Sequence, residues 1–350
     1  MKIGIDVRKI TDYGIGTHIR NVVLPSARMV PDHQFFLYYD PRDSFERDPA
    51  FHWVEEPAAK YSIREHLSLA KKAKKNRIDL FHAPHYTLPF FLNTPSIVTI
   101  HDLIHLKFPH YFPAWKVQAA KYVIRNAAKK SRSIITVSET TRTDLLNWMP
   151  FLEPKVNVIY NRLTEDCFQQ DSSIDLRSLG IANEFILYVG NFKKHKGIDT
   201  LIDAYRRDSG LPSLVLVGSG HNMDHDLSKE ILNMRNVRMF GFAGSQILRA
   251  LYSRALLFVF PSRYEGFGYP PLEAMAAGCP VLSSDAPAMK EVLGNAAEFF
   301  ECGNAEDLLV KLKSLLMQES RRKMYSDSGA LQARRFSSDE SSRKIVRLWG

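Results

Sequence analysis

Two carboxylates, Glu265 and Glu273, lie eight positions apart around a loop with two glycines. The backbone N–H groups of such a loop and of a first helical turn favour an anion such as a diphosphate. Carboxylate oxygens accept hydrogen bonds from sugar hydroxyls, whereas the amides donate to phosphate oxygens. Together the two kinds of group suit a ligand that carries both hydroxyls and phosphate, and a nucleotide sugar carries both.

The segment that must position these carboxylates runs from residue 257 to residue 285. Its apolar run 257–260 predicts a buried strand, and Pro270 with Pro271 fits a first helical turn, where a missing N–H group costs nothing. A second apolar run, 281–283, predicts another buried strand. Strand, glycine loop, helix and strand in this order form one unit of a parallel α/β sheet.

Each carboxylate also has a purely structural interpretation. We expect Glu265 on the loop and Glu273 in the first turn of the helix that follows. In those places Glu273 could cap its own helix, and Glu265 could be a solvated loop charge. Taken one at a time, the residues leave both interpretations open.

The stretch 265–281, EGFGYPPLEAMAAGCPV, resembles the donor-site signature of the retaining glycosyltransferases of family 4, in which Glu265 and Glu273 form the Glu-x7-Glu pair. The resemblance implies the GT-B fold, with two Rossmann-like, doubly wound parallel-sheet domains facing across a cleft. It also implies that Glu273 binds the ribose of the donor. The donor sugar and phosphate would be held by Glu265 and by the amides of Gly266, Phe267, Gly268 and Tyr269.

A second glycine- and lysine-bearing loop, residues 190–197 (GNFKKHKG), follows the apolar run 185–189. A strand, such a loop and a helix suit a phosphate, although the P-loop pattern G-x-x-x-x-G-K-[ST] is not satisfied. By itself Lys196 would be read as a surface lysine. In the resembled family a lysine at its position binds the diphosphate. Asn191 stands where that family commonly has an arginine, so one fixed cation is missing.

Candidate residues of the first half follow predicted strands. His101 comes directly after the apolar run 96–100, at the edge where α/β sheets bind ligands, although a structural histidine fits equally well there. VTIHDLIHLKFP around it resembles the acceptor-side motif of the family, which implies that His101 contacts the donor sugar. Gly14 and Gly16 indicate a simple turn after the first strand. The resemblance implies that this glycine loop faces the donor diphosphate.

Length and charge define two halves. At 350 residues the chain is expected to form two domains. We expect an acceptor-side domain over 1–162, a nucleotide-sugar-binding domain over 163–335, and a C-terminal helix over 336–350 that crosses back to the first domain. Residues 1–162 hold 24 Lys+Arg and 15 Asp+Glu, so the first half accounts for the whole net charge of +9. That half is therefore expected to meet an anionic partner.

Two basic segments in the first half could either bind an anionic membrane surface or be exposed to solvent. One is the run 71–77 (KKAKKNR), and the other is the helix predicted over 113–131, which mixes aromatic with basic residues. The alternative is that each is a solvated basic face of a helix docked on the sheet. No RNA-binding or DNA-binding motif accompanies the charge, so we expect no nucleic acid partner.

Other classes of protein are disfavoured by what the sequence lacks. The three cysteines have no C-x-x-C spacing, and no H-E-x-x-H pattern occurs, so we expect no metal and no resident cofactor. No apolar run is long enough to span a bilayer, and the first residues do not resemble a signal peptide. We therefore expect a cytoplasmic protein, bound peripherally to the inner face of the membrane.

The function predicted from these features is that of a retaining, metal-independent glycosyltransferase. It would move a sugar from a nucleotide-sugar donor, GDP-mannose in preference to UDP-sugars, to a saccharide or lipid-linked acceptor in the synthesis of cell-surface polysaccharide or glycolipid. His101, Lys196 and Glu265 would act at the reacting centre, while Gly14, Gly16, Asn191 and the loop 265–273 would bind the donor. The alternative is a non-catalytic partner subunit of the same fold that binds a nucleotide sugar without transferring it.

Overall fold

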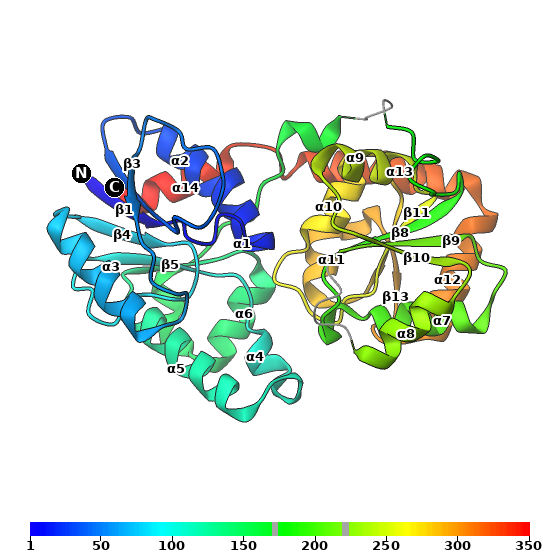
Figure 1. Ribbon diagram of the computed structural model, residues 1–350, viewed down its shortest axis with the longest axis horizontal. Coiled ribbons are helices and arrows are strands. Elements are labelled where there is room, and N and C mark those ends of the chain that lie inside the picture. The colour runs from blue at the N-terminus through cyan, green and yellow to red at the C-terminus, as the bar shows by residue number, and fades with distance from the viewer. Residues whose placement is uncertain (170–173, 219–223) are drawn as a thin grey trace. The chain divides into compact units, whose positions relative to one another are not determined.

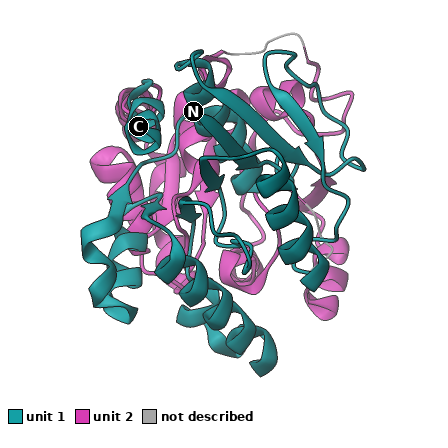
Figure 2. Ribbon diagram, turned by 90° about the vertical axis from the view of Figure 1, so that its left-hand side faces the viewer, with its two compact units in different colours: residues 1–162, 338–350 teal, residues 163–337 magenta. Residues whose placement is uncertain are grey.

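The computed structural model describes residues 1–169, 174–218 and 224–350 (Figure 1). Backbone contacts divide the chain into two compact units. Unit 1 comprises residues 1–162 and 338–350, and unit 2 comprises residues 163–337 (Figure 2). The C-terminal segment therefore belongs to the same unit as the N-terminus, although unit 2 separates them in the sequence.

Unit 1 is built on a seven-stranded parallel sheet with the order β3-β2-β1-β4-β5-β6-β7. Its strands are β1 (Lys2–Asp6), β2 (Gln34–Tyr39), β3 (His52–Glu55), β4 (Leu80–Ala83), β5 (Ser96–Ile100), β6 (Ser133–Thr136) and β7 (Val156–Val158). The order reverses between β1 and β4, so the loops that leave these two strands diverge. Ligands of open parallel sheets bind at the carboxyl ends of the strands around such a reversal.

Helices cover both faces of this sheet. They are α1 (Tyr13–His18), α2 (Leu24–Arg28), α3 (Ile63–Lys75), α4 (Ile104–Lys107), α5 (Ala114–Lys130), α6 (Glu139–Trp148) and α14 (Glu340–Trp349), with a π-helical turn, Ile19–Val23, joining α1 to α2. One buried cluster includes Val22 and Ile345, and a second includes Leu69 and Ile124. The α1–α2 segment and α14 thus pack on one face, and α3 and α5 on the other.

The helix α14 is anchored in unit 1 by its last residues. Trp349 is fully buried, and its ring lies 5.3 Å from that of Phe35 and 5.9 Å from that of His82. The Ser342 hydroxyl donates to the Val22 carbonyl at 3.2 Å. Burying a tryptophan removes 150–250 Å² of mostly apolar surface from water, so this one side chain supplies much of the docking free energy of the helix.

Unit 2 contains a six-stranded parallel sheet with the order β10-β9-β8-β11-β12-β13. Its strands are β8 (Phe185–Val189), β9 (Ser213–Val217), β10 (Val237–Gly241), β11 (Leu257–Phe260), β12 (Val281–Ser284) and β13 (Glu298–Phe300). The four residues of β11 are all fully buried between β8 and β12. Strands covered on both faces read as continuous apolar runs, which is how β11 appears in the sequence.

The helices of unit 2 also lie on both faces of its sheet (Figure 1). They are α7 (Ile198–Arg207), α8 (His225–Asn233), α9 (Ser245–Arg254), α10 (Tyr269–Ala276), α11 (Pro287–Leu293), α12 (Ala305–Met317) and α13 (Glu319–Arg334). The α7 helix packs against α12, and α10 packs against α13. Two doubly wound parallel sheets confirm the expected fold class. Across the described residues, no helix combines the length and the apolar character needed to cross a bilayer.

Candidate active site

Lys196 and Glu265 meet at the carboxyl edge of the sheet in unit 2. Lys196 ends a short 3-10 turn (Lys194–Lys196) in the loop after β8, and Glu265 lies in the loop after β11, the neighbouring strand. The Lys196 Nζ atom is 2.6 Å from Glu265 Oε1, and both side chains are largely shielded from solvent. Lys196 and Glu265, which the sequence predicts as site residues on separate grounds, therefore form one charged pair at the edge where parallel sheets bind ligands.

Glycines allow the two loops to approach each other. Gly197 has φ +69°, and a Cβ atom there would lie 2.0 Å from the Pro261 carbonyl oxygen. Gly268 has φ +93°, and a Cβ atom there would lie 2.4 Å from the Met289 methyl carbon. Any L-residue at either position would meet backbone strain, and at Gly197 it would also clash with backbone, whereas the Met289 methyl group near Gly268 can shift. These glycines therefore fix the path of the backbone that presents Lys196 and Glu265.

Glu273 lies in α10 and contacts a different partner. Because α10 begins at Tyr269, Glu273 falls in the second turn, so the expectation of a first-turn position is wrong, as is the suggestion that Glu273 caps its own helix. Its Oε2 atom accepts a hydrogen bond of 3.0 Å from the hydroxyl of Tyr252 on α9. Burial raises the pKa of Glu273, and the Tyr252 hydrogen bond partly opposes that shift.

The aromatic residues of the loop point into the protein. Phe267 and Tyr269 are buried, and the Phe267 ring packs edge-to-face against Tyr269 and Phe336, at 5.5 Å in each case. Both side chains therefore serve packing. What the segment 266–269 can offer a ligand is its backbone, which leads into α10, whereas Pro270 and Pro271 in the first turn of that helix carry no N–H group.

The loop that carries Lys196 is braced from two sides. The Tyr188 hydroxyl donates to the Asn191 carbonyl at 2.9 Å, and Asn191 Oδ1 accepts from the Lys193 amide at 3.4 Å. Burial, with the nearby Glu265 charge, raises the pKa of Tyr188 far above its usual value, so this hydroxyl stays protonated and can donate. Asn191 thus folds onto its own loop, and its amide stabilises the turn.

In unit 1, His101 follows β5 and is held by three neighbours. Its Nε2 atom lies 2.9 Å from the Pro84 carbonyl, which can only accept, so Nε2 carries the hydrogen. The Thr141 hydroxyl donates to the His101 carbonyl at 3.2 Å, and the ring of His18 meets the His101 ring edge-to-face at 5.0 Å. Burial lowers the pKa of His101. His101 is therefore neutral at pH 7, with Nδ1 as an acceptor.

His18 completes this histidine pair from α1. It is fully buried, and its Nδ1 atom lies 2.8 Å from Asn161 Oδ1. Burial and the neighbouring His101 lower the pKa of His18 well below its usual value, so it too is neutral.

Gly14 and Gly16 lie within α1 and not in a loop before it. A Cβ atom at Gly16 would lie 2.3 Å from the Ile10 carbonyl oxygen, so Gly16 lets the helix pack against the preceding turn. Gly14 is exposed, and a Cβ atom there would meet open space. Of the two glycines, Gly14 has the accessible backbone.

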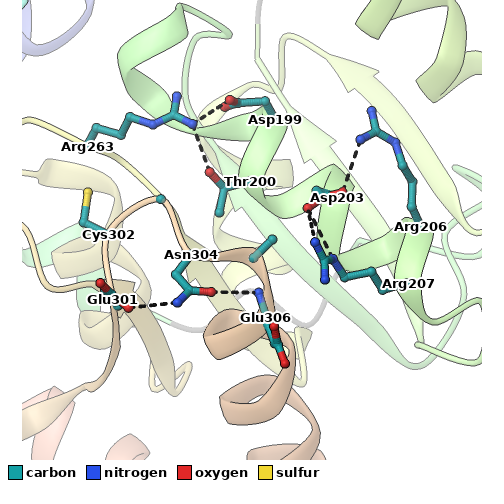
Figure 3. Close-up of a pocket in the computed structure, with 12 residues that line it drawn as sticks. Asp199, Thr200, Asp203, Arg206, Arg207, Arg263, Glu301, Cys302, Asn304 and Glu306 are labelled. Carbon is teal, nitrogen blue, oxygen red and sulfur yellow. Dashed lines mark hydrogen bonds and ion pairs between the residues drawn. The ribbon is translucent and has the colours of Figure 1, made fainter.

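A cavity of about 620 Å³ lies in unit 2 between the start of α7 and the loop before α12 (Figure 3). It borders the loop that carries Lys196, because its lining residue Arg263 donates to the Lys194 carbonyl at 2.8 Å. The described residues that line it carry three guanidinium groups and four carboxylates, and none of them is a site residue expected from the sequence. Arg263 is bonded to Asp199 and Thr200, and Arg207 to Asp203. The positive charges of the cavity lining are paired with its carboxylates, so the cavity lacks the excess positive charge that a diphosphate requires.

Sequence reasoning missed the partners of the predicted residues. Tyr252 lies 21 positions before Glu273, and Tyr188 precedes Asn191 by three in a strand that reads as plain core. Neither spacing carries a motif. His18 offered a signal, because a polar ring two positions after Gly16 and just before the apolar stripe of its helix is unusual at a core-facing position.

Two family models match the chain. The one described as Glycosyltransferase Family 4 matches residues 14–163, and the one described as Glycosyl transferases group 1 matches residues 175–332. Among curated proteins, the chain is similar to the O-antigen chain mannosyltransferase B of Escherichia coli, at 24% identity over 287 residues, 77% of this chain and 74% of that protein. It is also similar to the O-antigen chain mannosyltransferase RfbU of Salmonella typhimurium, at 28% identity over 246 residues, 69% of this chain and 66% of that protein.

Solved structures share the architecture. Sucrose-phosphate synthase from Thermosynechococcus elongatus superposes with a TM-score of 0.83 at 19% identity, covering 100% of this chain and 98% of that chain. The HepE protein of Anabaena, solved in complex with UDP-glucose, gives a TM-score of 0.80 at 18% identity, covering 100% of this chain and 99% of that chain. At these identities the likeness concerns the fold.

Proposed function

The chain belongs to glycosyltransferase family 4, and on that premise we propose that it is a retaining, metal-independent transferase that uses GDP-mannose in preference to UDP-sugars. Its acceptor is a saccharide or lipid-linked saccharide in the synthesis of cell-surface polysaccharide or glycolipid. The observation that carries the proposal is the Lys196–Glu265 pair, 2.6 Å long, beside the start of α10.

The donor is assigned to unit 2. Glu265 accepts a hydrogen bond from Lys196 at Oε1. A carboxylate can accept further hydrogen bonds, and here we assign them to hydroxyls of the donor sugar. Glu273 accepts from the ribose hydroxyls alongside Tyr252. The amides of 266–269 and the Lys196 ammonium hold the diphosphate, with Asn191 supporting the loop that carries Lys196.

The chemistry explains why cations and amides belong at the diphosphate. The bond between the anomeric carbon and the β-phosphate oxygen breaks, and its electron pair leaves with the nucleoside diphosphate. The acceptor oxygen bonds to the anomeric carbon and passes its proton to the departing phosphate. Negative charge therefore grows on the diphosphate, both in front-face attack and in a route through a covalent intermediate. Fixed donors aimed at that charge stabilise the transition state more than the ground state.

His101 is assigned to the donor sugar. Because Nε2 donates to the Pro84 carbonyl, Nδ1 is left to accept a hydrogen bond from a sugar hydroxyl. A neutral imidazole suits this role, since a charged one would lose its only acceptor. The mannosyltransferase names of the two curated relatives support mannose as the transferred sugar.

The partner proposed for unit 1 is an anionic membrane surface that brings a lipid-linked acceptor within reach. His66 of α3 stacks on Phe90 at 3.9 Å, and Phe90 meets Tyr122 of α5 at 5.7 Å, so the two helices are neighbours. The two helices and the loop that carries Phe90 also bear exposed apolar and basic side chains. We call them the α3–α5 surface: Arg64, Leu67, Lys71, Lys74, Phe91, Trp115, Lys116, Tyr122, Arg125 and Lys129.

The helix α5 has both features considered from the sequence, a face docked on the sheet and exposed aromatic residues among basic ones. Its apolar stripe, which includes Val117 and Ile124, is buried against the sheet, as the docked-helix alternative required. Trp115 and Tyr122 lie outside that stripe and are 68% and 65% exposed. Aromatic rings among lysines and arginines are the composition that binds the interface of an anionic bilayer.

A thermal-shift panel of nucleotide sugars tests the proposal. A ligand that binds only the folded protein raises the melting temperature by mass action, so GDP-mannose should give the largest shift and turnover with a lipid-linked acceptor should follow. A panel in which no nucleotide sugar shifts the transition would overturn the proposal. Binding without any turnover would favour the non-catalytic subunit, for which Asn191 at the usual arginine position is the specific observation.

A further inference from the structure

Tyr61 has a strained backbone at the ligand-binding edge of unit 1. It lies in the loop between β3 and α3 with φ +66°, a conformation that bulky L-residues rarely adopt. The residue is nevertheless 58% exposed, so burial of its ring does not compensate for the strain. Strained residues persist when their surroundings hold them in place, and they concentrate at functional sites.

Several contacts hold Tyr61. Its amide donates to the Glu65 carboxylate, and Glu65 is in turn paired with Arg8 at 2.8 Å. Lys9, which is 8% exposed, donates from Nζ to the Tyr61 hydroxyl at 2.8 Å. The hydroxyl end of the side chain is also hydrogen-bonded to Tyr86. The Lys9 ammonium also lies over the Tyr61 ring, 4.2 Å from its centroid, so it covers part of one ring face, and the residue is still 58% exposed.

The surroundings of the ring suit a sugar. Asp12 and Lys60 form a partly exposed ion pair of 2.8 Å, and Asp12 also lies 3.7 Å from the Lys9 ammonium. The negative face of an aromatic ring attracts the electropositive C–H groups on one face of a pyranose. A carboxylate and an ammonium beside the ring can bond the hydroxyls at the rim of the same sugar. An apolar platform with a few polar groups is how sites for small ligands are built.

The position relative to His101 gives the ring a role. The Tyr61 ring meets the His85 ring edge-to-face at 6.0 Å. His85 in turn lies close enough to His101 for the two to interact electrostatically. Lys9, His85 and His101 all follow the carboxyl ends of strands, of β1, β4 and β5 respectively. The Tyr61 ring therefore belongs to the same sheet edge as the histidine assigned to the donor sugar.

We propose that Tyr61 is the platform on which a pyranose of the acceptor stacks, with the Asp12–Lys60 pair at its rim. The inference rests on the proposed function, since it names the acceptor subsite of that transferase. A structural alternative is that Tyr61 only supports the capping of α3, in which Ser62 accepts from the Glu65 amide. An asparagine would fit that backbone conformation with less strain, so the alternative gives no reason for an exposed tyrosine ring.

Two variants separate the ring from the backbone. Tyr61→Phe keeps the ring and removes the hydroxyl that bonds Lys9 and Tyr86, whereas Tyr61→Asn removes the ring and relieves the strain. If the ring is the platform, the two variants should rank one way by melting temperature and the opposite way by affinity for the acceptor sugar. Tyr61→Asn should melt at or above the temperature of Tyr61→Phe, yet bind the acceptor sugar about three- to tenfold more weakly than the wild type. Tyr61→Phe should bind within a factor of about two of the wild type.

Saturation-transfer NMR on the full chain measures this with a named probe set, the methyl α-glycosides of mannose, glucose, galactose and N-acetylglucosamine. The wild type, Tyr61→Phe and the control Phe151→Ala should transfer saturation to the C–H protons of at least one glycoside. Phe151 is an aromatic residue of unit 1 that is 58% exposed, like Tyr61, and it lies outside the α3–α5 surface. Tyr61→Asn should lose the transfer. No transfer in the wild type, or equal transfer in Tyr61→Asn, would overturn the platform. The nucleotide-sugar thermal shift involves unit 2, so failure of the proposed function would be seen separately.

Discussion

Lys196 Nζ and Glu265 Oε1 are 2.6 Å apart, although the two residues lie 69 positions apart in the sequence. The pair joins the loops that leave two adjacent parallel strands, β8 and β11. Glu265 neutralises Lys196 and holds the ammonium at the sheet edge. On the proposed function, the donor diphosphate would meet a cation that is already positioned, so little reorganisation would be needed when charge develops on the leaving group.

Removing the ammonium should damage catalysis more than folding. Lys196→Ala takes away a fixed cation at the leaving diphosphate, and we expect kcat/KM to fall about 10²- to 10³-fold, the usual cost of losing one such donor. Lys193→Ala, an exposed lysine of the same loop, is the matched control and should stay within a factor of about three. Equal losses in both variants would show that the loop contributes only general positive charge.

Glu273→Gln should stabilise the free protein at neutral pH while weakening donor binding. Burial raises the pKa of Glu273 above its unfolded value, so the folded state holds the proton more tightly and stability falls as pH rises through the raised pKa. A neutral glutamine removes that loss. Hydrogen bonds to a charged acceptor contribute about 1.5–3 kcal/mol, so the donor Kd should rise about 10- to 100-fold.

Melting curves at pH 5 and pH 8, with and without GDP-mannose, check the Glu273→Gln prediction. The wild type should lose more stability than the variant between the two pH values. A variant that melts below the wild type at pH 8, or that keeps the full shift with GDP-mannose, would show that Glu273 is a structural residue.

Tyr252→Phe tests the same carboxylate through its partner. The Tyr252 hydroxyl stabilises the ionised form of Glu273 at 3.0 Å, so its loss should raise the pKa of Glu273 further. Donor binding that needs the carboxylate should then weaken at a higher pH than in the wild type. The acidic limb of the kcat/KM profile against pH reports this shift. If the acidic limb lies at the same pH in Tyr252→Phe as in the wild type, a group other than Glu273 controls that limb.

The two glycines of α1 should respond in opposite directions to alanine. Gly16→Ala forces a methyl group to within 2.3 Å of the Ile10 carbonyl oxygen, and we expect a loss of about 1–3 kcal/mol in the free energy of unfolding. Gly14→Ala places its methyl group in open space and should be neutral or stabilise the helix by about 0.5–1 kcal/mol. Denaturant unfolding of both variants decides, and a stable Gly16→Ala would contradict the packing described for that residue.

The α3–α5 surface predicts salt-sensitive binding to anionic vesicles. Vesicles with about one-third phosphatidylglycerol should bind the protein at low ionic strength and release it as salt screens the lysines and arginines. The double variant Trp115→Ala/Tyr122→Ala should bind about tenfold less. Phe242→Ala is the control, because Phe242 of unit 2 is 80% exposed and lies outside this surface. A wild type that does not bind even at low salt would remove the membrane from the account.

The sequence predicts most elements because their apolar runs are bounded by strong signals. The strands β11 (Leu257–Phe260) and β5 (Ser96–Ile100) span the apolar runs 257–260 and 96–100 from which they are predicted. The register of α10 was less predictable, since two prolines fit any position of a first turn. In the structure the helix begins at Tyr269, before both prolines, and Glu273 lies in its second turn.

Contacts between distant residues could not be predicted from spacing. Glu265 and Lys196 were each expected at the site, but their pairing depends on β8 and β11 being neighbours, which sequence order does not reveal. The strain at Tyr61 was also hidden, because tyrosine gives no signal for a left-handed conformation. Local patterns report the elements, whereas the chemistry arises where loops from different strands meet.

The central claim is that Glu273, Glu265 and Lys196 hold a nucleotide sugar at the carboxyl edge of unit 2. Calorimetric titration of GDP-mannose into the wild type, Glu273→Ala and the control Glu306→Ala tests it most directly. We expect saturable binding in the wild type, unchanged affinity in Glu306→Ala, whose residue lines the cavity between α7 and α12, and at least tenfold weaker binding in Glu273→Ala. Equal affinity for GDP-mannose in all three proteins would contradict the claim.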